Sequence, residues 1–128
     1  MNRPLLVIAA LFGLIAVLFG AFGAHGLEGS VSAERLAVWE TGAHYLGWHA
    51  TTLLAVALLG AHRSGILLTV AGWALAAGAA VFSGSLFILV LTDTPAWGAI
   101  TPIGGLALAV GWGALALAAV FGRERGAD

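Results

Sequence analysis

The chain has 128 residues, of which 61% are hydrophobic and 9% are charged, and its mean hydropathy is +1.04. A soluble domain carries about 25% charged residues, so this composition excludes an ordinary soluble fold and predicts one integral membrane domain over residues 1–128. The sequence has no cysteine, which excludes disulfides and thiolate chemistry, and a net charge of −1 without a basic cluster gives no reason to expect nucleic acid as a partner.

The first apolar segment covers residues 5–24. The hydrocarbon core of a bilayer is about 30 Å thick and needs about 20 helical residues, so this segment has the length of a transmembrane helix. A cleavable signal peptide has a shorter apolar core of about 7–15 residues and is the less favoured alternative. The segment ends in "GAFGAHG" (20–26), where Gly26 is the expected helix stop and His25 is expected to make a structural hydrogen bond.

The second predicted helix covers residues 33–60 and begins outside the membrane. Ser32 is a suitable N-cap, because its hydroxyl can accept a hydrogen bond from a backbone N–H of the first turn. Glu34 follows in that turn, where a carboxylate complements the helix dipole.

Ionisable side chains are concentrated on this second helix. Glu40 and His44 are four residues apart and therefore neighbours on one face. His49 follows Tyr45 by four residues and lies about 7.5 Å deeper than His44. Ionisable groups inside a membrane span are costly, so each of these is a candidate functional residue.

The third and fourth predicted helices cover residues 66–91 and 102–121. The third contains "FSGSL", in which Ser83 and Ser85 can bond to carbonyl groups of their own helix or to a neighbouring helix. The fourth begins at "TPIGG", where Thr101 is the expected N-cap and the proline after it takes the first helical position.

These segments predict an all-α membrane protein in which four transmembrane helices form a compact antiparallel bundle. Both termini and the 61–64 connection hold four of the five arginines, Arg3, Arg63, Arg123 and Arg125. Because arginine is enriched on the cytoplasmic side, we expect cytoplasmic N- and C-termini and a multi-pass location in the bacterial cytoplasmic (inner) membrane. The tail "RERGAD" is expected to be disordered.

Small residues at four-residue spacing predict close helix contacts, because apolar burial alone drives little association in lipid. The expected contact ridges are Ala16, Gly20 and Ala24 in the first helix, Gly72, Ala76, Ala80 and Gly84 in the third, and Gly105, Ala109 and Gly113 in the fourth. Indole rings favour the headgroup zone, so Trp39 and Trp97 are expected at the outer interface. Trp48, Trp73 and Trp112 are expected to be packing residues deeper in the bundle.

His25, Glu40 and His44 are expected to approach one another near the outer mouth of the bundle. The favoured interpretation is that Glu40 pairs with His44 at the headgroup level. A metal site built from His25, His44 and His49 is a weaker alternative, because the ligands come from separate helices and lack a metal-binding spacing. No metal and no cofactor are expected.

His49 needs a hydrogen-bond partner, because an unpaired buried polar group costs about 1–3 kcal/mol. The expected partners are Tyr45, Thr52, Ser83 and Ser85. The favoured role is an interhelical hydrogen bond that fixes the register of the helices. The alternative role is a protonatable site in a transport path.

Several motifs together resemble one family of small membrane proteins, the YgdD-like family filed as domain of unknown function 423, which includes an animal mitochondrial relative. The matching pieces are "GAFGAHGL" (20–27), "TGAHYLGWH" (41–49), "FSGSL" (82–86) and "TPIGG" with "GW" (101–105 and 111–112). They occur in the family's order and cover essentially the whole chain.

The resemblance implies four transmembrane helices and no established activity. It implies recurring polar positions at His25, Tyr45, His49, Ser83, Ser85, Thr101 and Pro102. It also implies that the position of His44 is variable and that Glu40 lies outside the motif, which weakens a metal site that depends on His44.

The sequence leaves three classes of function. The favoured one is a structural or accessory protein that packs against membrane lipids, a second copy of itself or a larger membrane complex. The alternative is a small transporter or channel with a polar path around His49, Ser83 and Ser85. An enzyme is not expected, because no activated nucleophile or carboxylate pair is present.

Overall fold

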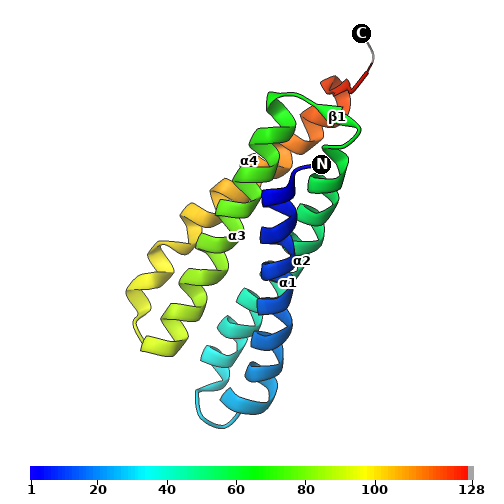
Figure 1. The fold of residues 1–128 in the computed structure, drawn as a ribbon. Coiled ribbons are helices and arrows are strands. Elements are labelled where there is room, and N and C mark those ends of the chain that lie inside the picture. The colour runs from blue at the N-terminus through cyan, green and yellow to red at the C-terminus, as the bar shows by residue number, and fades with distance from the viewer. Residues whose placement is uncertain (127–128) are drawn as a thin grey trace.

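A computed structural model of the chain describes residues 1–126, and within that range it contains four long helices (Figure 1). They are α1 (Arg3–Phe22), α2 (Ala33–Leu59), α3 (Ile66–Thr92) and α4 (Thr101–Phe121). A π-helical turn, η1 (Gly23–Leu27), continues α1, and a 3-10 turn, η2 (Pro95–Ala99), precedes α4. The short strands β1 (Arg63–Ser64) and β2 (Arg123–Glu124) pair with each other. The all-α class is confirmed, and the expected helix ranges lie close to these bounds.

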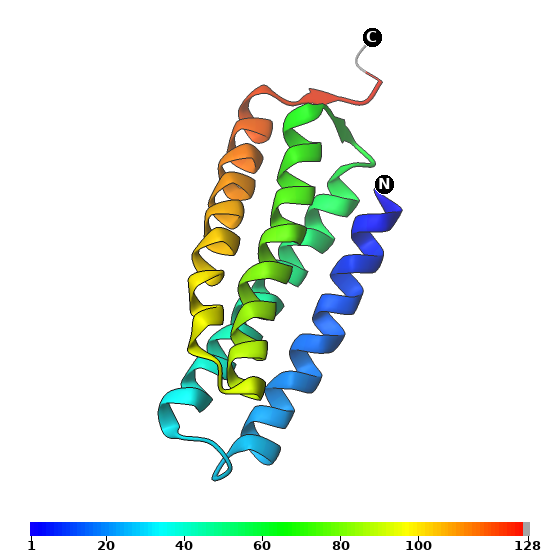
Figure 2. The same cartoon turned by 90° about the vertical axis from the view of Figure 1, so that its left-hand side faces the viewer.

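The four helices form two antiparallel hairpins that pack through α2 and α3 (Figures 1 and 2). α1 packs on α2, and α4 packs on α3, so α1 and α4 lie at the two edges of the molecule (Figure 2). The N-terminus and the end of the described chain lie at the same end of the bundle (Figure 1).

Three helical stretches within residues 1–126 are long and apolar enough to cross a membrane: Arg3–Leu27, Ile66–Thr92 and Pro95–Phe121. α2 is as long as α3 but is not among them. Its first turns carry charged residues and its middle carries His44 and His49, which lower its hydropathy.

Two residues predicted to mark helix ends, Thr101 and Gly26, do not do so. α4 begins at Thr101, after a residue, Ile100, that already has helical backbone angles and makes no side-chain cap. Thr101 is therefore not an N-cap, because η2 leads almost directly into α4. By contrast, Ser32 is confirmed as the N-cap of α2: its hydroxyl accepts a hydrogen bond from the N–H of Arg35 at 3.1 Å.

Gly26 is not the stop of the first helix. It lies inside η1, and a Cβ at this position would come within 2.6 Å of the Phe22 ring. The glycine that takes the left-handed conformation after the helix is Gly29, with φ of +81°. Gly26 thus leaves room for the Phe22 ring and does not reverse the chain.

The close contact between α3 and α4 uses a different face of α4 from the one expected. The buried positions of α4 are Gly104, Leu108, Gly111, Ala114 and Ala118. A Cβ at Gly104 would meet the backbone of Phe82, and one at Gly111 would lie 2.7 Å from Cγ of Leu75. Gly105 and Ala109 of the expected ridge each follow a buried position by one residue, which corresponds to about 100° of rotation around the helix, and Gly113 is exposed.

The expected ridges of α1 and α3 are each correct only in part. In α3, Gly72 and Ala76 are buried, and a Cβ at Gly72 would meet the Leu5 side chain of α1. Ala80 is exposed, and neither Gly84 of α3 nor Gly20 of α1 has an atom within contact distance of an added Cβ. The small residues of these two helices are therefore divided between packing and exposed positions.

The burial of the tryptophans differs from expectation. Trp39 is 1% exposed, and its indole N–H donates to the carbonyl of Phe19 at 2.7 Å. It packs against the rings of Phe19 and Phe87, so its side chain belongs to the protein core. The three tryptophans expected to be packed, Trp48, Trp73 and Trp112, are 61%, 45% and 47% exposed on the apolar surface.

The tail after α4 is partly ordered, against expectation. Arg123 and Glu124 of β2 pair antiparallel with Ser64 and Arg63 of β1. The N–H of Arg125 also donates to the carbonyl of His62 at 2.8 Å. The rest of the expected disordered segment, residues 127–128, lies outside the described residues.

Candidate functional site

His49 is the one histidine of the chain that the bundle buries, with 5% of its surface exposed. It lies on the inner face of α2. Its Nδ1 is 2.7 Å from the carbonyl oxygen of Tyr45, one turn earlier. Its Nε2 accepts a hydrogen bond from the indole N–H of Trp112 on α4 at 3.1 Å. Both ring nitrogens therefore have partners inside the protein.

These two bonds assign the tautomer of His49. A carbonyl oxygen only accepts and an indole N–H only donates, so the proton is on Nδ1 and the lone pair of Nε2 faces Trp112. A metal would need that same lone pair. The ring in this arrangement is a fixed link between α2 and α4, which are otherwise separated by α3.

The partner of His49 on the other helix was not expected from the sequence. Tyr45 contributes its backbone carbonyl rather than its hydroxyl, and no bond joins His49 to Thr52, Ser83 or Ser85 among residues 1–126. Trp112 was expected only to fill space. The signal that could have found it is the indole N–H, which requires an acceptor when it faces a protein interior.

Tyr45 covers His49 on one side. Its ring stacks on Phe82 of α3 at 4.4 Å and lies 6.0 Å from the His49 ring, between ring centroids. Trp48 adds a third contact at 5.3 Å. This aromatic layer separates the imidazole from the exposed surface of α2.

Ser83 joins α3 to α2 directly. It is fully buried, and its hydroxyl donates to the carbonyl of Gly42 at 2.7 Å. The absence of a side chain at Gly42 permits this approach, because a Cβ there would lie 2.8 Å from the Phe87 ring.

Ser85 joins α3 to α4. Its hydroxyl donates to the carbonyl of Phe82 at 2.8 Å, and it lies 2.6 Å from the hydroxyl of Thr101. The Thr101 hydroxyl also lies 3.5 Å from the carbonyl of Trp97, so each hydroxyl has a carbonyl acceptor and either one can be the donor between the two side chains. The predicted residues Ser83, Ser85 and Thr101 are thus all interhelical hydrogen-bonding groups.

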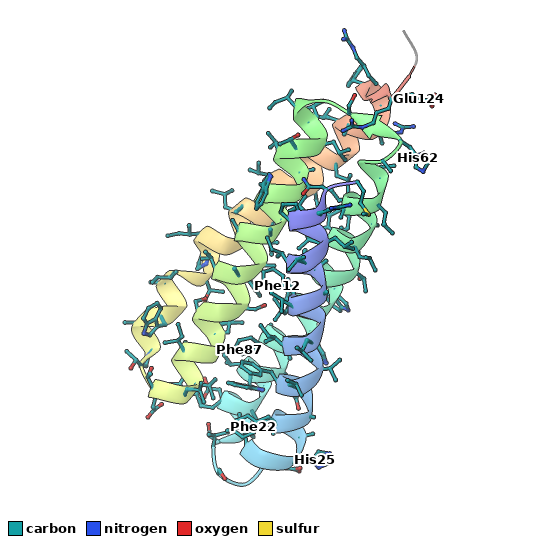
Figure 3. The ribbon with its side chains drawn as sticks, viewed as in Figure 1. Phe12, Phe22, His25, His62, Phe87 and Glu124 are labelled. Carbon is teal, nitrogen blue, oxygen red and sulfur yellow. The ribbon has the colours of Figure 1, made fainter. Side chains whose placement is uncertain are left out.

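The expected group of His25, Glu40 and His44 is not formed. All three side chains are exposed, and the described residues contain no group of three or more histidine, cysteine or acidic residues that could hold a metal ion. His25 lies at the end of the molecule opposite His62 and Glu124, with its ring directed away from the bundle (Figure 3). Within residues 1–126 it has no side-chain hydrogen bond, because the π-helical turn carries it outward.

Glu40 and His44 also do not pair with each other. The ring of His44 instead lies 6.5 Å from that of Trp48. The ion pair found among the described residues joins Arg35 Nε to Asp93 at 3.3 Å and ties the start of α2 to the end of α3. Sequence reasoning missed this pair, because Arg35 lies on α2 and Asp93 at the end of α3, far apart in the sequence.

The fold and this set of bonds define a class of protein: a small helical membrane protein whose inward polar groups bond helix to helix. The chain belongs to the family described as "Protein of unknown function (DUF423)", whose model matches residues 19–105. This confirms the resemblance stated from the motifs. The matched region contains every candidate residue from His25 to Thr101 but ends before Trp112.

Curated relatives support the same assignment. The chain is 47% identical over 119 residues to the UPF0382 membrane protein YwdK of Bacillus subtilis, covering 92% of this chain and 97% of the relative. It is 45% identical over 107 residues to a UPF0382 membrane protein of Staphylococcus aureus, covering 84% and 87% of the two chains. No solved structure matches the chain. It is therefore a small membrane protein of uncharacterised function.

Proposed function

We propose that the chain is a four-span accessory protein of the bacterial cytoplasmic membrane, which packs against lipids or a larger membrane complex. The observation that carries this proposal is the closure of its polar interior. Within the described residues, every buried side-chain nitrogen and oxygen has a hydrogen-bond partner in the protein. The groups that could have served transport, His49, Ser83 and Ser85, are used to hold helices together.

The fourth span of this proposal is α2. It contacts α1 along its whole length, from Trp39 against Phe19 at one end to the carbonyl of Ala57, which accepts from the N–H of Asn2, at the other. Its other side faces α3. A helix packed between two apolar helices of membrane-spanning length lies at the same depth as they do, and its buried ionisable group, His49, faces protein rather than lipid.

The proposed orientation places both termini in the cytoplasm. Support comes from the arginines, because the end that holds the termini carries four of the five. Both connections at the opposite end carry acidic residues, and Arg35 there is paired with Asp93.

A labelling experiment tests the span count and the orientation together. The chain lacks cysteine, so single cysteines report without background. Ser30→Cys and Ala61→Cys place exposed thiols at the two ends of α2. A membrane-impermeant maleimide applied to intact spheroplasts should label Ser30→Cys at once and Ala61→Cys only after permeabilisation. Labelling of both from one side means that α2 does not cross, and the reverse pattern means that the orientation is inverted.

A second experiment separates an accessory role from transport. Ala50→Cys and Ser85→Cys place thiols at buried positions beside His49 and Thr101. A water-soluble methanethiosulfonate reagent should leave both unmodified, while the exposed Ser30→Cys control reacts fully. Reaction at the buried positions means that a water path runs through the bundle and supports the transporter alternative.

The accessory role itself requires a partner surface. Val17 of α1 is 72% exposed and faces away from the bundle. A photo-crosslinking amino acid at this position in cells should give one protein adduct of discrete mass, and the same probe at buried Leu75 should not. Lipid adducts alone at Val17 mean that the protein has no complex at this face.

A further inference from the structure

The end of the bundle that holds both termini gathers positive charge. Arg3, Arg63, Arg123 and Arg125 all lie there, since β1 and β2 bring residues 63–64 and 123–124 side by side. Glu124 is the acid at this end within residues 1–126 (Figure 3). The other described acids, Glu28, Glu34, Glu40 and Asp93, lie toward the opposite end. The arginines at this end therefore exceed its described acids.

A cavity of about 460 Å³ opens among three of these arginines. Arg3, Arg63 and Arg125 stand on its rim, and the buried side chains of Leu5, Val56 and Leu68 form part of its apolar wall. It lies where α1 begins, α2 ends and α3 begins. A cavity with a cationic rim and an apolar wall suits an anion that is attached to a hydrocarbon chain.

A second cavity of about 290 Å³ adjoins the first across β1. The two share Arg63, Gly65 and Leu68 in their walls. Phe121 and Ile66 give the second cavity a mainly apolar lining, and Arg123 lies at its margin. An apolar space directly beside the cationic rim offers room for the first part of an acyl chain.

The side chains of Arg63 and Arg125 beside these cavities are fixed by hydrogen bonds within the protein, and each still has N–H groups left to bind a ligand. Nη1 of Arg63 donates to the carbonyls of Ala118 and Ala119, at 3.5 and 3.2 Å, and Nε of Arg125 donates to the carbonyl of Arg63 at 3.3 Å. A guanidinium has five N–H donors, so each retains several for a ligand. The first N–H groups of α3 receive no side-chain cap from Gly65 and add partial positive charge at the same place.

We propose that this end of the protein binds the phosphate headgroup of an anionic phospholipid between Arg3, Arg63 and Arg125, with an acyl chain along Leu68 and Phe121. The inference rests on the proposed membrane-spanning arrangement, which places the arginines at the level of the headgroups. The apolar lining favours a lipid over free phosphate, because a small soluble anion would gain nothing from those walls. An electrostatic contribution of this kind corresponds to about a fivefold change in affinity for each arginine.

Native mass spectrometry of the purified full chain tests the proposal. The protein is given equal amounts of dioleoylphosphatidylglycerol and dioleoylphosphatidylcholine, and the lipid retained after detergent removal is measured. We expect retention of the anionic lipid to exceed that of the zwitterionic lipid. We expect Arg3→Gln to reduce that preference about fivefold and the double variant Arg3→Gln, Arg125→Gln to reduce it about twenty-fivefold. Arg35→Gln removes the same charge at the opposite end and should leave the preference unchanged.

Each other outcome overturns the proposal. If the unaltered protein retains the two lipids equally, a site for an anionic headgroup is excluded, and no variant needs to be measured. An equal loss in Arg35→Gln and Arg3→Gln means a diffuse charge effect rather than a site at this end. Displacement of the lipid by excess inorganic phosphate means a free-anion site. The lipid measurement is made on purified protein and tests the lipid site alone. The cysteine labelling in spheroplasts tests the membrane-spanning arrangement, so the two proposals can fail independently.

Discussion

His49 explains how a polar ring can be built into a chain this apolar. Its two nitrogens have opposite hydrogen-bonding roles in the neutral form, and the bundle offers one acceptor, the carbonyl of Tyr45, and one donor, the indole of Trp112. The bond to Trp112 joins helices that share few other contacts. We therefore interpret His49 as a residue that sets the position of α4 relative to α2.

Trp112→Phe should weaken the fold measurably. The change keeps an aromatic ring but removes the donor that Nε2 of His49 has within residues 1–126, and Nε2 is then a buried acceptor whose partner is lost. We expect the free energy of unfolding to fall by about 1 kcal/mol, within the range for lost interhelical bonds in membranes and for unsatisfied buried groups. Unfolding in mixed micelles, followed by tryptophan fluorescence or circular dichroism, measures the change.

Trp73→Phe is the matched control for this prediction. Trp73 is exposed to nearly the same degree as Trp112, but no hydrogen bond of its indole is found within residues 1–126. It should change the stability by no more than a few tenths of a kcal/mol. Equal effects of the two changes mean that the Trp112 bond contributes nothing and that both rings act through surface contacts alone.

At the scale of helices, the contact between α3 and α4 depends on three glycines. Gly78 of α3 faces Gly104 and Leu108 of α4, and Gly111 lies against Leu75 one to two turns further along. An added Cβ at any of these positions would meet backbone atoms, which cannot move aside as a flexible side chain can. Close backbone approach is thus the main means of association of this pair.

Gly104→Ala should separate α3 from α4. Its Cβ would meet the backbone of Phe82, and overpacking of this kind costs about 1–3 kcal/mol. Gly113→Ala is the matched control, since it lies on the same helix with no atom within 4 Å of its added Cβ. It should leave stability unchanged or raise it slightly, through the better helix propensity of alanine. The melting temperatures of the two purified variants decide the matter, and equal values contradict the assigned face.

The sequence was sufficient for the helices but not for their contact faces. Helix length follows from hydropathy summed over about 20 residues, which is why the bounds of α1, α3 and α4 could be predicted closely. The face cannot be read in the same way, because these helices are apolar on all sides and a four-residue glycine pattern fits several faces. In α4 the pattern at Gly105 and Gly113 was as good as the true one at Gly104 and Gly111.

In the candidate site, too, the sequence indicated which residues form interhelical hydrogen bonds but not which partners they bond to. Ser83 and Ser85 could be expected to bond between helices from their position in an apolar segment, and they do. The choice of partner depends on rotations of α2 and α4 that no local pattern encodes, so Trp112 was missed. His25 and His44 were placed together because they share a depth in the membrane, yet depth does not determine direction around a helix.

The whole molecule consists of two helical hairpins joined by one interface. That interface contains the Ser83 bond to Gly42, the Trp112 bond to His49 and the contact of Trp39 with Phe87. At one end of the bundle it also includes the Arg35–Asp93 pair, which joins α2 to the end of α3. The two halves should therefore recognise each other without the covalent connection.

Residues 1–61 and 62–128, produced as separate chains in one cell, should co-purify in equal amounts through a tag on either one. Each half contains a complete hairpin, and the cut leaves β1 and β2 on the same half. Gly42→Leu in the first half should abolish the association, because its side chain would occupy the place of the Phe87 ring. Association that persists with this change means that the hairpins meet through another surface.

The π-helical turn η1 has a consequence for how the length of this chain can change. Such a turn holds one more residue than an α-helical turn between the same two levels. Deleting Ala24 can therefore convert η1 to regular helix while Phe22 and the buried Leu27 keep nearly the same places. A deletion in the middle of α1 would instead rotate everything after it by about 100°. Residues 23–27 are thus where α1 could lose a residue with least effect on the packing of the core.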